Sequence, residues 1–291
     1  MRWTPGRRSS NLEDRRGASS GGGGFGMGGG GFRGGGRLGL GGLVVLLILS
    51  AVFKTDFLSL AGGGGGVQEA PSAEVAPVTD PREEPTVLLV SAVLDSTQNM
   101  WRRMLPQMGA QYQDARLVLF RDATETACGY GQAATGPFYC PGDGKVYIDL
   151  GFFQELRDRF RAPGDFAQAY VLAHEIGHHV QNLLGTSGQV HRAQQQNQGN
   201  ANALSVALEL QADCFAGVWG HTAAQQGILD AGDVEEGLGA AAAVGDDRLQ
   251  KMSTGRVSPE SWTHGSSTQR MQWFRRGFEG GDPRQCDTFG R

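Results

Sequence analysis

Apolar and polar residues alternate with two different periods after residue 85, and each period predicts one kind of element. In residues 86–105 the apolar positions recur at helical spacing, and Pro106 ends that helix. Residues 116–121 and 145–150 are short alternating runs rich in β-branched and aromatic residues, which is typical of strands. We therefore expect a small sheet packed on several helices, an α+β domain.

Two further apolar segments, residues 170–180 and 204–219, predict helices. The second is apolar on nearly every face, which predicts that it is buried. Its only charged residues are Glu209 and Asp213. Because a buried carboxylate without a partner is strongly disfavoured, both carboxylates should have partners.

The first of these helices carries a pattern typical of a metal site. His174 and His178 lie four residues apart, so they share one helix face and can bind one metal ion, while Glu175 projects from the adjoining face. Catalytic zinc keeps one position for water and lowers the pKa of that water to about 7, and a glutamate that does not bind the metal can accept the proton. The pattern arises by chance in roughly one chain in a hundred of this length, so the rest of the sequence has to support it.

Glu209 and Asp213 are also four residues apart and share a face. Glu209 is the predicted third zinc ligand, and Asp213 is predicted to accept the second ring N–H of a ligating histidine, which fixes the orientation of that ligand. The alternative is that both carboxylates pair with arginines elsewhere. A third histidine at the metzincin spacing is excluded, because Leu184 stands at that position.

The other histidines have different expected places. His179 points away from the shared face and is interpreted as a residue that supports a ligand or packs in the core, rather than as a ligand. His191 lies in a Gln-, Asn- and Gly-rich stretch expected to be a solvated loop, and His221 is expected at the exposed end of the second helix. His264 lies in a polar loop before a predicted helix over residues 267–278. There it is predicted to donate a hydrogen bond to the oxyanion of a tetrahedral intermediate; the alternative is that it caps or packs that helix.

Several longer segments resemble the neutral zinc metallopeptidases of bacteria, in order, over about residues 86–290. The resemblance implies a mainly helical, zincin-like fold that is a compact relative of the gluzincins. It also implies zinc on His174, His178 and Glu209, with Glu175 as the base. In peptidases of this type an edge strand aligns the extended substrate, and residues 145–150 are the strand we expect in that role. The segments that carry the resemblance are GPFYCP at 136–141, HEIGHHVQ at 174–181, ELQADCFAG at 209–217, GDDRLQ at 245–250 and THGSS at 263–267.

Composition divides the chain into four predicted parts. Residues 1–36, with many of the 47 glycines, are predicted to be a disordered Gly/Arg-rich cytoplasmic arm. Residues 37–60 are predicted to be a transmembrane signal anchor with arginines on its N-terminal flank, so that the remainder is exported; a cleaved signal peptide is the alternative. Residues 61–85 are predicted to be a flexible linker and residues 86–291 a zinc metallopeptidase domain.

The four cysteines fit export to an oxidising compartment. Cys128 and Cys140 enclose a short Gly-rich loop, and a bridge between them would leave Cys214 to pair with Cys286. Four cysteines allow three connectivities, and the spacing alone does not choose among them. No Cys-x-x-Cys pair is present, which argues against a thiolate zinc site.

These observations predict a single-pass, membrane-anchored zinc peptidase that hydrolyses peptides or unfolded protein segments outside the cytoplasmic membrane. The alternative is a non-catalytic, zinc-stabilised extracytoplasmic binding or assembly protein. Glu175 favours the enzyme, because a structural zinc site has no use for a base. The net charge of −4 and the lack of a basic aromatic surface argue against nucleic-acid binding. The sequence makes no prediction about oligomeric state.

Overall fold

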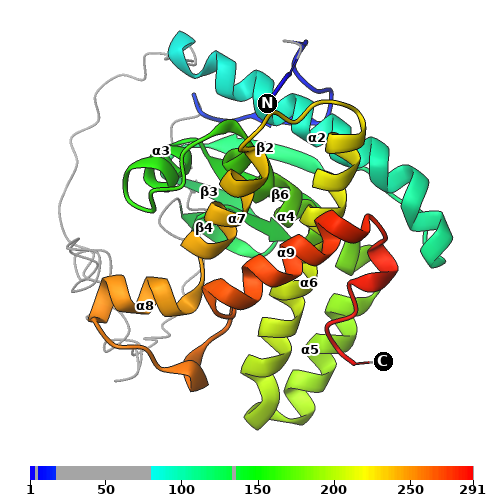
Figure 1. Cartoon of the computed structure of the whole chain (residues 1–291), viewed down its shortest axis with the longest axis vertical. Coiled ribbons are helices and arrows are strands. Elements are labelled where there is room, and N and C mark those ends of the chain that lie inside the picture. Colours follow the sequence, from blue (N-terminus) through cyan, green and yellow to red (C-terminus); the bar gives the residue numbers. More distant parts are fainter. Residues whose placement is uncertain (4–5, 18–79, 133–135, 291) are drawn as a thin grey trace, which may run out of the picture. The chain divides into compact units, whose positions relative to one another are not determined.

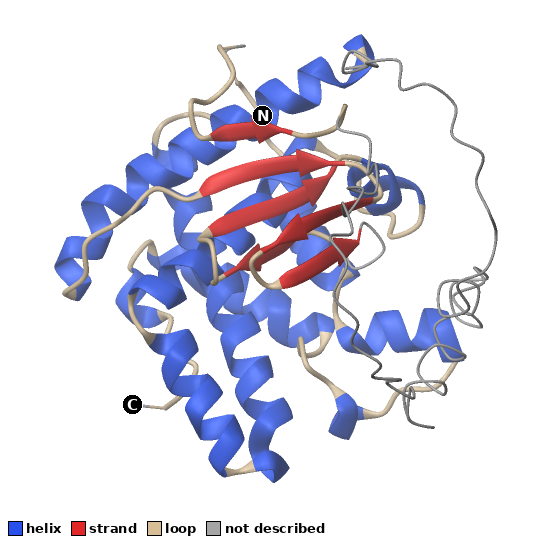
Figure 2. Ribbon diagram, turned by 180° about the vertical axis from the view of Figure 1, so that it is seen from behind, coloured by secondary structure: helices blue, strands red, loops and turns tan. Residues whose placement is uncertain are grey.

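The computed structural model describes residues 1–3, 6–17, 80–132 and 136–290 of the 291-residue chain. These residues form eight α-helices, a four-stranded sheet and a two-stranded hairpin (Figures 1 and 2), so the expected α+β class is confirmed. The helices are α2 (Glu84–Met104), α3 (Gly151–Asp158), α4 (Asp165–Leu183), α5 (Thr186–Gln196), α6 (Ala201–Gln225), α7 (Asp233–Ala243), α8 (Asp246–Thr254) and α9 (Ser267–Gly280), and the hairpin consists of β3 (Ala123–Thr126) and β4 (Gly129–Gln132).

The sheet has the strand order β1-β2-β6-β5, formed by β1 (Leu12–Asp14), β2 (Arg116–Phe120), β6 (Lys145–Asp149) and β5 (Phe138–Cys140). The first three strands in this order are parallel, and β5 is antiparallel to β6. Because β6 is paired on both sides, the prediction that residues 145–150 form an edge strand is wrong. In the described part of the chain, the edge on that side of the sheet belongs to β5.

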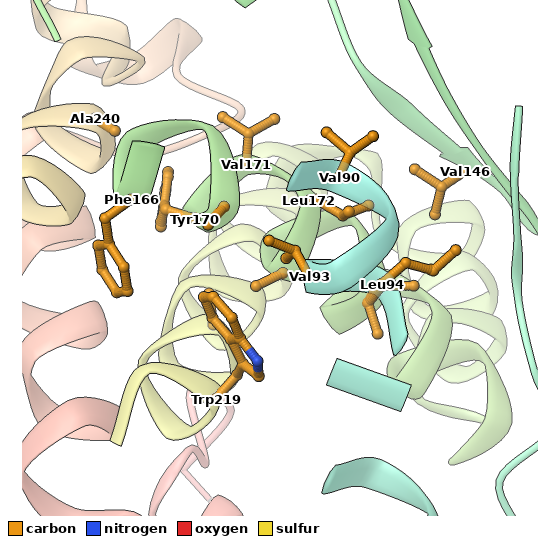
Figure 3. Packing of buried hydrophobic residues seen from close by; sticks show 14 of the residues in the cluster. Val90, Val93, Leu94, Val146, Phe166, Tyr170, Val171, Leu172, Trp219 and Ala240 are labelled. Carbon is orange, nitrogen blue, oxygen red and sulfur yellow. The ribbon is translucent and has the colours of Figure 1, made fainter. Parts of the chain in front are cut away.

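One face of the sheet packs against α2 and α4 (Figure 3). Alternate residues of a strand face the same side, so Leu117 of β2 and Val146 of β6 both enter the main apolar cluster. Val90 and Leu94 of α2 and Leu172 of α4 belong to the same cluster and are almost fully buried. This contact fixes α4, the helix with the histidine pair, against the sheet.

Helices α6 and α9 touch at their backbones. A Cβ atom added to Gly217 of α6 would lie 2.1 Å from the carbonyl oxygen of Phe274, and one added to Gly277 of α9 would lie 1.9 Å from the carbonyl oxygen of Cys214. Only glycine permits such an approach, because any side chain would overlap the neighbouring backbone. The contact holds the C-terminal half of α9 beside α6.

The N-terminal residues belong to the folded unit. Strand β1 lies beside β2, where the N–H of Leu117 donates to the carbonyl of Asn11 and the N–H of Arg15 donates to the carbonyl of Leu119. The Arg16 side chain is almost fully buried and pairs with Glu83, just before α2, and with Asp14 of β1. Arg8 joins Asp14 to Glu84, Ser9 donates to Asp95, and Lys145 pairs with Glu13.

Two predictions about domain organisation are corrected by this arm. The prediction of a disordered arm over residues 1–36 is wrong for the described residues of its first seventeen, because pairing with a distant strand orders them. The prediction of a cytoplasmic arm and an exported domain is also wrong. Strands joined by backbone hydrogen bonds lie on one side of a bilayer, so β1 and the domain cannot occupy opposite sides of a membrane. The predicted anchor at 37–60 and most of the linker at 61–85 lie outside the described residues. None of the described helices has the length and apolar character that a membrane span requires.

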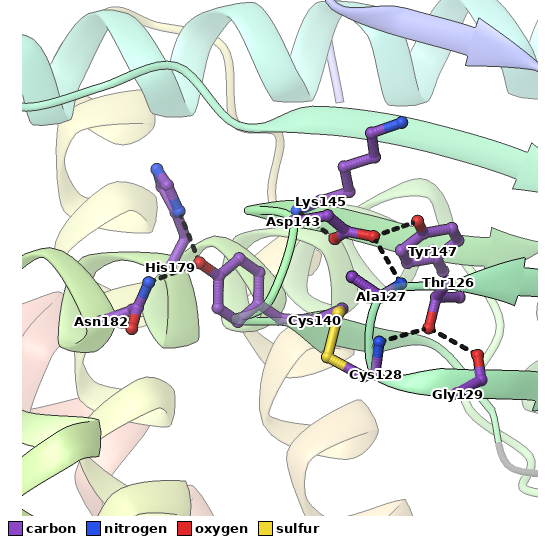
Figure 4. Close-up of a disulfide and its surroundings, with 11 residues drawn as sticks. Thr126, Ala127, Cys128, Gly129, Cys140, Asp143, Lys145, Tyr147, His179 and Asn182 are labelled. Atoms are coloured by element: carbon purple, nitrogen blue, oxygen red, sulfur yellow. Dashed lines mark hydrogen bonds between the residues drawn. A yellow bond between two sulfur atoms is a disulfide. The ribbon is translucent and has the colours of Figure 1, made fainter.

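Two disulfides join the four cysteines, Cys128 to Cys140 and Cys214 to Cys286. The first connects the turn of the β3–β4 hairpin to β5 (Figure 4), and Asp143 accepts hydrogen bonds nearby from the Tyr147 hydroxyl and the N–H of Ala127. The second joins α6 to the C-terminal segment. The pairing that the spacing left open is thereby decided.

The stretch expected to be a solvated loop around His191 is largely helical. Residues 186–196 form α5, and Val190 is buried on its inner face. The Gln194 amide donates to the carbonyl of Ala201 and to the hydroxyl of Ser205 in α6. Packing against α6 therefore orders a sequence whose composition predicted a loop.

Candidate metal centre

Helices α4 and α6 bring His174, His178 and Glu209 together. The two histidine Nε2 atoms are 3.2 Å apart, and the Glu209 carboxylate lies 3.2 Å from Nε2 of His174 and 3.4 Å from Nε2 of His178. Ligand atoms of the three residues all lie within 4.8 Å of one another. The helices cross closely here, because a Cβ atom on Gly177 would lie 3.1 Å from the Cα atom of Ala212. The predicted ligand set is therefore assembled.

The chemistry of this group fits a bound cation. Nδ1 of His174 lies 2.9 Å from a carboxylate oxygen of Asp213, which only accepts, so Nδ1 carries a proton and Nε2 is free to bind. Nδ1 of His178 lies 2.9 Å from the side-chain oxygen of Gln181. Two Nε2 lone pairs that face each other and a carboxylate repel unless a positive charge lies among them. Two neutral imidazoles and a carboxylate are the donor set of catalytic zinc sites.

The pKa values of the three residues also indicate a site that favours positive charge. Burial lowers the pKa of His174, but Asp213 and Glu209 outweigh burial and raise that pKa to about 10. The pKa of His178 is raised for the same reason, with Glu209 outweighing its burial. Burial raises the pKa of Glu209, yet the neighbouring histidines hold it well below its usual value. A carboxylate that stays ionised beside two histidines is suited to metal binding.

Glu175 lies on the same helix as the histidines and lines the same cavity. Its side chain is buried, and burial raises its pKa above the usual value. A carboxylate with a raised pKa is a stronger base than an exposed one, which is what a proton acceptor near neutral pH requires. Glu175 thus lines the site without belonging to the group of three possible ligands.

Asp213 connects the metal ligands to a buried polar network. Its carboxylate accepts hydrogen bonds from the Tyr170 hydroxyl and from both Nε and Nη2 of Arg270, at 2.8 and 2.9 Å for the arginine. The arginine pairing that the sequence left as an alternative therefore coexists with the bond to His174. Nη2 of Arg270 also lies 3.7 Å from Glu209. One buried guanidinium thus offsets part of the negative charge of both carboxylates.

His264 lies at the same cavity on the loop before α9. Its Nδ1 is 3.1 Å from Oδ1 of Asp246, while Oδ2 of Asp246 accepts the backbone N–H groups of Thr263, His264 and Gly265. Asp246 thus holds both the loop and the ring. The hydrogen bond that the His264 ring donates to Asp246 raises the pKa of His264.

A cavity of about 590 Å³ opens over these residues. Its wall on one side is β5, through Phe138 and Tyr139. The cavity is also lined by the apolar side chains of Phe152, Phe160, Val171, Val244 and Leu249.

The remaining histidines stay outside the ligand group. His179 is buried, with one ring nitrogen 3.1 Å from the Tyr139 hydroxyl and the other 2.6 Å from the carbonyl of Gln113, so its interpretation as a packing residue agrees with its contacts. Asn182 donates to the same hydroxyl. His221 lies within α6 rather than beyond its end, and it donates to the carbonyl of Phe278.

The sequence matches the family described as "Putative neutral zinc metallopeptidase" over residues 1–289. The chain belongs to this family. It is 49% identical over 298 residues to the uncharacterized protein YpfJ of Escherichia coli (strain K12), an alignment that covers 100% of this chain and 99% of YpfJ. It is 47% identical over 211 residues to the uncharacterized protein Rv2575 of Mycobacterium tuberculosis, covering 69% of each. No solved structure matches the chain.

Membership of the zinc metallopeptidase family and the His174, His178 and Glu209 group together support Zn²⁺ as the cofactor. The sequence did not assign Tyr170 or Gln181 to the site. Tyr170 precedes His174 by four residues and Gln181 follows His178 by three, so each shares a helix face with a ligand. This spacing is the signal by which the sequence could have placed Tyr170 and Gln181 at the site.

Proposed function

We propose that the protein is a zinc-dependent peptidase that hydrolyses peptide bonds with Glu175 as the general base. The observation that carries this proposal is a buried carboxylate of raised pKa placed beside two histidines and a glutamate that form a metal-binding group. Bound zinc would supply a Lewis acid that activates water and polarises the scissile carbonyl. A zinc site with a purely structural role has no use for this base.

In the proposed reaction water adds to the carbonyl carbon, and Glu175 accepts the proton that the water loses. Glu175 then passes that proton to the amide nitrogen as the C–N bond breaks, so a carboxylic acid and an amine are released. His264, held by Asp246, donates a hydrogen bond from Nε2 to the carbonyl oxygen while that oxygen carries negative charge.

The substrate in this proposal is an extended peptide that lies along β5. The sheet ends at β5 among the described residues, and two residues of this strand line the cavity. Main-chain pairing with such an edge orients a peptide without regard to its side chains. The apolar residues that line the cavity, among them Phe160 and Val171, suit a large apolar side chain next to the scissile bond.

The two disulfides favour an oxidising compartment, so we propose that the domain acts outside the cytoplasm. Membrane attachment through residues 37–60 stays a prediction. If this segment anchors the protein, the ordered arm requires β1 and the domain to be on the same side of the membrane.

The test compares the full chain with its Glu175→Gln form, because the arm belongs to the domain and a protein that starts at residue 86 would lack β1. Both proteins are assayed for bound zinc and for cleavage of a mixed peptide library. We expect equal zinc content and a loss of cleavage of at least about a hundredfold in the variant. Equal cleavage by both proteins would refute the proposed mechanism and favour a zinc-stabilised binding protein.

A further inference from the structure

Gln181 contacts the metal site through His178 and is held by several hydrogen bonds. Its side chain is fully buried on α4, three residues after His178. The amide nitrogen lies 2.7 Å from the carbonyl oxygen of Leu208 and 3.2 Å from the side-chain oxygen of Gln211, both on α6. A carbonyl oxygen only accepts hydrogen bonds, so the nitrogen of Gln181 must face α6 and its oxygen must face His178.

This orientation determines the protonation of the histidine ring. The Gln181 oxygen lies 2.9 Å from Nδ1 of His178 and can only accept, so Nδ1 carries the proton. The lone pair of the neutral ring is then on Nε2, the atom that faces His174 and Glu209. With the amide the other way round, its N–H group would favour a proton on Nε2 and block metal binding there.

We infer that Gln181 is a positioning residue that fixes the tautomer and ring orientation of His178 for metal binding. This inference rests on the proposed metal centre at His174, His178 and Glu209. The two histidines then differ in the group that accepts the hydrogen bond from Nδ1, because Asp213 is a carboxylate and Gln181 is a neutral amide. His174 donates a charge-assisted hydrogen bond to Asp213, and His178 donates an ordinary one to Gln181.

A second amide extends the same chain of hydrogen bonds to the C-terminal segment. The Gln211 nitrogen donates to the carbonyl oxygen of Cys286 at 2.9 Å, which leaves the Gln211 oxygen to accept from Gln181. Cys286 is joined to Cys214 of α6 by a disulfide, so that acceptor is covalently held in place. The orientation of Gln181 is thus fixed by groups from two segments distant in sequence.

The test uses the full chain and measures its zinc dissociation constant by competition with a chromophoric chelator. Three variants are compared. Gln181→Met keeps the volume of the side chain and removes the acceptor, Gln181→Glu keeps an acceptor for Nδ1, and Gln168→Ala changes a glutamine of α4 that lies outside the metal cavity. We expect Gln181→Met to weaken zinc binding by about 10- to 100-fold, and Gln181→Glu and Gln168→Ala to bind within a few-fold of the unchanged protein.

A spectroscopic measurement separates positioning from a general loss of stability. In the cobalt-substituted protein, we expect the ring N–H protons of the two histidine ligands to give separate, paramagnetically shifted NMR signals. We expect Gln181→Met to broaden the His178 signal by exchange with water and to leave the His174 signal sharp. Unchanged zinc affinity together with two sharp signals would overturn the inference. If the unchanged protein binds no zinc, the proposed function itself fails.

Discussion

Asp213 holds the ring of His174 on the side opposite its metal-binding nitrogen. The Asp213 carboxylate lies 2.9 Å from Nδ1 of His174, and Nε2 of the same ring faces His178 and Glu209. Because Arg270 binds the same carboxylate through two nitrogens, Asp213 stays ionised although it is fully buried. Burial by itself would raise the pKa of Asp213, and Arg270 and His174 together lower it.

We expect Asp213→Asn to weaken zinc binding by about 10- to 100-fold, because a neutral amide no longer fixes the His174 tautomer with a charge-assisted bond. The change also leaves the buried Arg270 without its carboxylate, so the free energy of unfolding should fall by about 3 kcal/mol. Chelator competition and urea denaturation measure the two effects. Asp247→Asn is the matched control, because Asp247 binds the backbone and hydroxyl of Ser267 rather than a ligand. Zinc affinity equal to that of the control would remove Asp213 from the metal centre.

The hydrogen bond between Asp246 and His264 gives a prediction about pH. If His264 donates from Nε2 while Nδ1 faces Asp246, the ring must carry both protons, so activity falls as pH rises through the pKa of His264. Asp246 raises that pKa, so it extends activity to higher pH. We expect Asp246→Asn to shift the alkaline limb of kcat to lower pH, and His264→Ala to lower kcat by about 100- to 1,000-fold with normal zinc content. An unchanged rate in His264→Ala would assign His264 to capping or packing instead.

The arm gives a prediction about stability. Arg16 is almost fully buried between Asp14 and Glu83, so its removal takes the buried cation from both carboxylates and leaves each with only a partly exposed arginine, Arg8 or Arg121. We expect Arg16→Ala to lower the free energy of unfolding by about 3 to 5 kcal/mol in urea denaturation of the full chain. Arg7→Ala, at an exposed position of the same arm, should change it by less than about 0.5 kcal/mol. Equal stability of the two variants would show that the arm does not contribute to the fold.

The arm also shows why part of the fold was not predictable. Strand β1 has three residues, Leu12–Asp14, and its partner lies about a hundred residues later at Leu117. Charged residues such as Arg8 and Arg16, followed by a glycine-rich run, have the composition of a solvated segment. Only their pairing with β2 and with the start of α2 distinguishes these residues from a solvated segment. The same limit applies to the edge strand, because the order of β5 and β6 in the sheet depends on which strands pair and not on the residues of either strand alone.

The metal ligands were predictable because their spacing is a local property. The helical repeat alone places His174, Glu175 and His178 on adjoining faces of one helix, and it places Glu209 and Asp213 on one face of another. Burial of an apolar helix then requires partners for its carboxylates. These arguments use only residues within a few turns of each other.

Tertiary structure decided how the two helices meet and which side chains support the ligands. The close contact of Gly177 with Ala212 sets the distance between α4 and α6, and the glycine contacts of α9 bring Arg270 to Asp213. The orientation of Gln181 depends on acceptors on α6 and on the C-terminal segment. Periodicity determines which residues share a face of one helix, whereas the relation between helices depends on packing between residues that are far apart in the chain.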